Sequence, residues 1–82
     1  MKEFIEEMRN KANEVYNARK PYFQKKLRSA MIESADKGDT IAMVCVQGCH
    51  DARNFERYIG EIGLTCEQSY INESWHWYKV EF

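Results

Sequence analysis

The segment from Val46 to Asp51 holds the residue types best suited to chemistry in this chain, because Cys49 is directly followed by His50. An apolar run gives way to a helical pattern here, and the backbone N–H groups at such a junction favour anions. A thiol at a helix N-terminus beside an imidazole can act as an activated nucleophile. No third group that would orient the imidazole is evident, however. A small thiol enzyme or sensor centred on Cys49 is therefore the last of three functional hypotheses, and we expect no enzymatic activity.

Metal binding is the second chemistry that the residue types suggest. The ligand-type side chains are Cys45, Cys49, His50, Cys66 and His76. The cysteines form no C-x-x-C pair, and Cys45 lies in an apolar run where it is better interpreted as a small core residue. We therefore expect neither a metal nor another cofactor. An odd number of cysteines in a chain without a recognisable export signal predicts free thiols and a cytoplasmic location.

A cationic stretch runs from residue 16 to residue 28 of a chain whose formal net charge is −1. It contains five basic and no acidic side chains, namely Arg19, Lys20, Lys25, Lys26 and Arg28. Aromatic residues are interleaved with these cations, as they are on surfaces that hold phosphates and bases. The stretch predicts either a nucleic-acid-binding accessory protein or a docking face for an acidic protein surface. The alternative is that it forms the solvated side of a helix.

Two tryptophans near the C-terminus, Trp75 and Trp77, are spaced so that both point to the same face of a strand. If the inward set begins with His76 and Tyr78, the tryptophans form an exposed aromatic pair of the kind found at protein interfaces. The opposite assignment makes both of them core residues. The sequence leaves these two alternatives open.

The elements that position these residues follow from apolar periodicity. Residues 2–35 repeat apolar positions at helical steps, and Pro21 predicts a break or kink at residues 17–21. Residues 40–46 predict a strand buried on both faces, and a short amphipathic helix follows and ends at Gly63. Residues 64–71 and 75–82 predict a closing hairpin.

This order of elements predicts a single α+β domain over residues 1–82, with a small three-stranded sheet. A crossover helix between the first two strands favours a parallel pair, so that the sheet is expected to be mixed. The longest apolar run has six residues, far fewer than the ~20 that span a bilayer, and predicts no membrane association. Ile5, Met8, Ala12 and Val15 form a heptad-like run that would also suit helix pairing in a homodimer.

The run from Ala52 to Leu64, together with the charged first helix and the Trp-rich hairpin, resembles small accessory proteins of phages and mobile elements. Such proteins often bind and block a host protein, including components of antiviral defence. The resemblance implies a non-enzymatic inhibitor, anti-CRISPR-like in action, whose partner is a protein and which acts in the host cytoplasm. The leading hypothesis is therefore an interaction module that presents either the basic helix or the last strand to a macromolecule.

Overall fold

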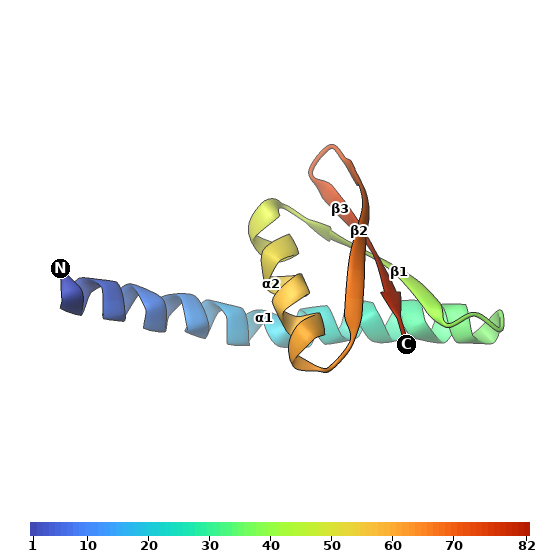
Figure 1. The fold of residues 1–82 in the computed structure, drawn as a ribbon, viewed down its shortest axis with the longest axis horizontal. Coiled ribbons are helices and arrows are strands. Elements are labelled where there is room, and N and C mark those ends of the chain that lie inside the picture. The colour runs from blue at the N-terminus through green and yellow to red at the C-terminus, as the bar shows by residue number, and fades with distance from the viewer.

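A computed structural model describes all 82 residues of the chain. A long helix, α1 (Lys2–Asp36), is followed by strand β1 (Ile41–Gln47), helix α2 (Cys49–Glu61) and strands β2 (Thr65–Asn72) and β3 (Trp75–Glu81). Figure 1 shows α1 extending well beyond the rest of the molecule at its N-terminal end. The predicted α+β class, with a long helix before a β-α-β-β unit, is confirmed.

Helix α1 continues through Pro21, so of the break or kink predicted at residues 17–21 the break is wrong and the kink stays a prediction. Pro21 is exposed, so its ring meets no neighbouring element, whereas Tyr16 and Phe23 on either side of it are both buried in the same core. Packing on both sides of the proline outweighs its local cost to the helix. The helix ends where the sequence predicts, because Gly38 takes a left-handed conformation with φ 78° directly after it.

The sheet has the strand order β1-β3-β2, and both pairs of neighbouring strands are antiparallel. Strands β1 and β2 therefore run in the same direction, as the crossover helix requires, but β3 lies between them. The predicted mixed sheet is wrong in this respect, because the hairpin returns β3 to the inner side of β2 rather than to its outer edge. A bulge between Gln68 and Tyr70 interrupts the β2–β3 register.

Strand β1 is buried on one face only, which corrects the prediction of burial on both. Ala42, Val44 and Val46 are buried, whereas Ile41 and Met43 on the other face are exposed. The reason is that both helices pack on the same side of the sheet and leave the other side uncovered. We call this uncovered side the open face.

The core lies between the two helices and the inner face of the sheet. Its ten clustered residues are Tyr16, Phe23, Leu27, Val44, Val46, Ala52, Phe55, Ile59, Tyr78 and Val80. Aromatic rings from α1, α2 and β3 contact one another in this core, with ring centroids 5.9 Å apart for Phe23 and Phe55 and 5.3 Å apart for Phe55 and Tyr78. This core fixes the position of every candidate site residue from residue 16 onwards.

Candidate interaction surfaces

The five cations of residues 16–28 do not form one surface, because they point around most of the circumference of α1. Arg19 lies toward the start of α2 and forms a two-pronged ion pair with Asp51, with an Nη2–Oδ2 distance of 2.6 Å. Its guanidinium also lies over the ring of Tyr22, 4.1 Å from the centroid. The hydrogen bonds to Asp51 raise the pKa of Arg19 above its ordinary value. This arginine joins two helices and is not free for a ligand.

Lys20 is also engaged within the fold, at the other end of α2. Its Nζ lies 3.5 Å from a carboxylate oxygen of Glu61, and the same carboxylate accepts a hydrogen bond of 2.7 Å from the hydroxyl of Tyr16. The hydrogen bond from Tyr16 lowers the pKa of Glu61, with Arg57 acting in the same direction. Burial, reinforced by that hydrogen bond, raises the pKa of Tyr16 to about 12.

Lys26 reaches across to β1, where its ammonium group donates to the backbone carbonyl of Cys45. The ammonium also lies 5.2 Å from the ring centroid of Trp75 and 5.5 Å from that of Tyr22. Cation–π contacts of this kind hold the lysine between α1 and the open face. Three of the five predicted cations are thus engaged in contacts within the fold.

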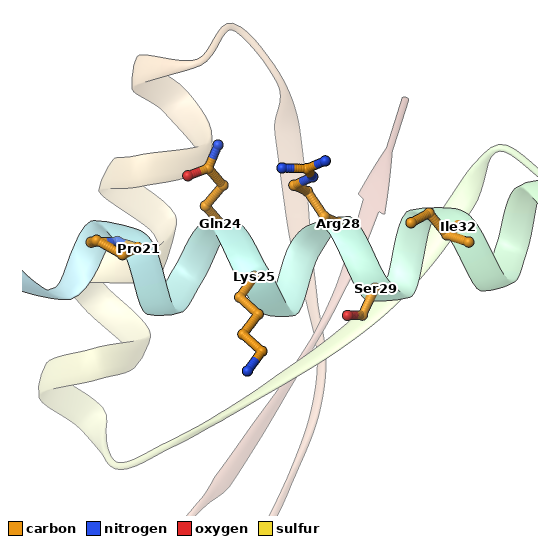
Figure 2. A pocket seen from close by; sticks show the side chains of 6 residues that line it. All are labelled: Pro21, Gln24, Lys25, Arg28, Ser29 and Ile32. Carbon is orange, nitrogen blue, oxygen red and sulfur yellow. The ribbon is translucent and has the colours of Figure 1, made fainter.

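The remaining two cations, Lys25 and Arg28, lie on the solvent side of α1. They line a shallow hollow together with Pro21, Gln24, Ser29 and Ile32. Figure 2 shows that Gln24 and Arg28 point to one side of the helix, whereas Lys25 and Ser29 point to the other. The polar groups of this hollow diverge, so they do not form a convergent binding site for a small ligand.

Trp75 and Trp77 lie on the open face, which decides between the two alternatives that the sequence left open. Trp77 is paired with Cys45 of β1 and with Tyr70 of β2, and Tyr78, one residue further on, is fully buried on the inner face. The rings of Tyr70 and Trp77 are stacked, with centroids 5.7 Å apart and planes inclined by 13°. Both tryptophans are half-buried by these neighbours.

The open face carries further large apolar side chains that no helix covers. Ile41 and Met43 on β1 are 42% and 39% exposed, and Tyr70 on β2 is 50% exposed. Where β1 meets α1 the face deepens into a groove of about 660 Å³, lined by Tyr22, Lys25, Lys26, Ser29, Ala30, Glu33, Met43, Val44, Cys45 and Trp77. The groove was missed at the sequence level, because it needs the side-by-side placement of α1 and β1, which no local pattern encodes.

A second apolar surface lies on the part of α1 that projects from the body. We call residues 2–15 the arm, since all of them are exposed. Its apolar stripe consists of Phe4, Ile5, Met8, Ala12 and Val15. The stripe was predicted either to pack on the sheet or to pair with another helix, and within one chain it does neither.

The thiols are not gathered into a site. Cys49 is the first residue of α2 and is exposed, as is His50, and the neighbouring Asp51 is held by Arg19. Cys66 points toward the core, and burial raises its pKa. All three cysteines are free, and no group of three or more His, Cys, Asp or Glu side chains lies close enough to hold a metal ion. The thiol hypothesis stays a prediction to which the geometry adds nothing.

Comparisons of the chain with protein-family models, with curated proteins and with solved structures found no match. No helix, α1 included, combines the length and the apolar character needed to cross a membrane. What the fold and its surfaces define is a two-layer α+β domain with one open sheet face and one projecting helical arm.

Proposed function

We propose that this protein is a non-enzymatic interaction module whose open face binds a protein partner. The proposal is carried by one observation: Trp75, Trp77, Tyr70, Met43 and Ile41 share a sheet face that no helix covers. Tryptophan, tyrosine and methionine are enriched at protein interfaces, and uncovered apolar patches on small domains mark such sites. A half-buried tryptophan is already ordered before binding, which lowers the entropic cost of contact.

The mode of action that we propose is occlusion of the partner. The resemblance to small phage accessory proteins implies an inhibitor, and the partner it implies is a host defence protein. A flat apolar face suits this role, because an inhibitor of this kind acts by covering a surface of its partner and does not have to catalyse a reaction. The groove beside β1 would accept a protruding side chain of the partner, with Lys26 at its edge favouring an acidic one.

The test is affinity capture from a host lysate with the wild-type chain and with a Met43→Glu/Tyr70→Glu variant. Both residues are exposed on the open face, so the charges should abolish capture without disturbing the core. Ile32→Glu is the matched control, because Ile32 is 60% exposed on the solvent side of α1. Both tryptophans of the chain lie on the open face, so their fluorescence should shift on binding of the purified partner. A face variant that captures the same partner as wild type would overturn the proposal.

The alternative is nucleic-acid binding, for which Lys25 and Arg28 on the solvent side of α1 are the remaining observation. Two free cations neutralise about two phosphates, so the logarithm of affinity should fall with the logarithm of salt with a slope of about −2. A mobility-shift titration of wild type against Lys25→Glu/Arg28→Glu measures this slope. Binding that vanishes in the variant supports the alternative, whereas no shift at low salt removes it.

A further inference from the structure

The arm is the least supported element of the fold as a single chain. Residues 2–15 make no buried contact, and a helix of about this length is marginal in water without tertiary packing. Its exposed side chains include Phe4 at 54%, Ile5 at 45% and Val15 at 53%. Covering this stripe with a surface from outside the single chain would remove its apolar side chains from water and stabilise the arm.

One edge of the stripe, formed by Ile5 and Ala12, lies on the side of α1 that faces the core. Ile5, Ala12, Tyr16 and Phe23 follow one another at steps of seven, four and seven residues, which returns to one side of an α-helix. The side that α1 turns toward its own sheet therefore continues along the arm, where no sheet is present. The arm cannot reach the open face of its own chain, because α1 is one continuous helix that packs on the opposite side of the sheet.

A second copy offers a matching surface in its open face. The arm is about 21 Å long at 1.5 Å per residue, and a seven-residue strand such as β1 is about 23 Å long at 3.3 Å per residue. An arm laid across the open face would convert two layers into three, with helices on both sides of the sheet. Under a two-fold axis each copy supplies one arm and one face, so that the contact is made twice.

The charges also favour the open face over a second arm. Arg9 and Lys11 are the charged residues nearest to the two edges of the apolar stripe, whereas Glu3, Glu6, Glu7 and Glu14 lie farther round the helix. Two antiparallel arms packed stripe to stripe would bring Arg9 toward Arg9 and Lys11 toward Lys11 of the other copy, which is unfavourable.

The hairpin side of the open face is acidic. Strands β2 and β3 with their turn carry Glu67, Glu73 and Glu81 against the single cation Lys79. Cations beside an apolar stripe match carboxylates around an apolar face.

We propose that the protein forms a homodimer in which the arm of each copy covers the open face of the other. The dimer rests on the proposal that the open face is a binding surface. In the dimer the arm of the second copy occupies this face, so an outside partner has to displace it. Self-association of purified protein is measured without any lysate, so the dimer and the capture of a partner can fail separately.

The first test is molar mass by light scattering over a range of protein concentrations. Wild type should move from the chain mass of 9.8 kDa toward twice that value, and Met8→Glu should stay at the chain mass. Asn10→Glu, on the far side of the arm, is the matched control and should dimerise as wild type does. A wild-type chain that stays monomeric at every concentration would overturn the dimer.

The second test uses Cys45, which lies on the open face and is half-buried in the groove. In a Cys49→Ser background, Met8→Cys should form an intermolecular disulfide with Cys45 under oxidised glutathione, and Cys45→Ser should abolish it. Asn10→Cys in the same background should not link to Cys45. A bridge between two Met8→Cys positions that survives Cys45→Ser would show arm-to-arm pairing and sink the proposed arrangement.

Discussion

Among the single residues, polar side chains connect α1 to α2 and to the sheet. The hydroxyl of Tyr16, a residue only 1% exposed, donates to Glu61, and Arg57 and Lys20 approach the same carboxylate. Tyr78 does the same between the sheet and α2, where it donates to Glu56 with an O–O distance of 3.0 Å. Burial raises the pKa of Tyr78, and the hydrogen bond to Glu56 acts in the same direction.

Because these tyrosines are buried, we expect the free energy of unfolding to fall in alkali. An unfolded chain releases the Tyr16 proton near the ordinary pKa of 10, whereas the folded chain retains it until about pH 12. The contribution of the Tyr16 hydroxyl to the free energy of unfolding is therefore complete below pH 10 and is lost as the pH rises toward 12. Tyr16→Phe should make the fall in the free energy of unfolding shallower over this interval, as measured by urea unfolding. Tyr70→Phe, at an exposed tyrosine, is the control, and an equal effect of both substitutions would contradict the assignment.

The surroundings of the tryptophans and of the cations in residues 16–28 could be predicted only in part from the sequence. The spacing of Trp75 and Trp77 placed them on one face, but only the cross-strand partners Cys45 and Tyr70 identify it as the open face. The cations of residues 16–28 were visible as a group. Their division into three structural and two free side chains depends on the position of Asp51, Glu61 and the Cys45 carbonyl, which are remote in sequence.

Among the elements, α1 should become more stable when Pro21 is replaced. It removes one backbone hydrogen bond from the interior of α1, and a proline there costs about 3 kcal/mol relative to alanine. Stiffening of the unfolded chain by proline offsets up to about 1 kcal/mol of this cost. Pro21→Ala should therefore raise the free energy of unfolding by about 2 kcal/mol in chemical denaturation. Gln24→Ala, at an exposed position one turn away, should change it by less than about 0.5 kcal/mol. A destabilised Pro21→Ala would show that the proline suits a local distortion of α1.

The elements themselves were predictable because each has a strong local signal. The 3.6-residue period of α1 and α2, Gly38 after α1 and the aromatic strands of the hairpin gave their types and approximate ends. Strand order was not predictable, since a hairpin places β3 beside β2 on either side with equal local chemistry. The one-sided burial of β1 had no local signal either, because its run of apolar residues is the same whether one or two faces are covered.

At the scale of the whole molecule, the protein measures 52 × 26 × 17 Å, and the arm accounts for its elongation. Stability along α1 should therefore be uneven. The part of the helix that carries Tyr16, Phe23 and Leu27 is held by the core, whereas the arm opens without disturbing any buried contact.

Amide hydrogen exchange on the Met8→Glu chain, which should remain monomeric, tests this gradient. Residues 3–15 should exchange with little protection, and residues around Phe23 and Leu27 should exchange far more slowly, because only the latter require the core to open. In wild type the same arm amides should gain protection as protein concentration rises, while those of the core stay constant, since covering the stripe by a second copy stabilises the arm alone. Arm amides that are equally protected in both chains and at all concentrations would mean that the helix is stable by itself, which would remove the energetic reason for a second copy to cover it.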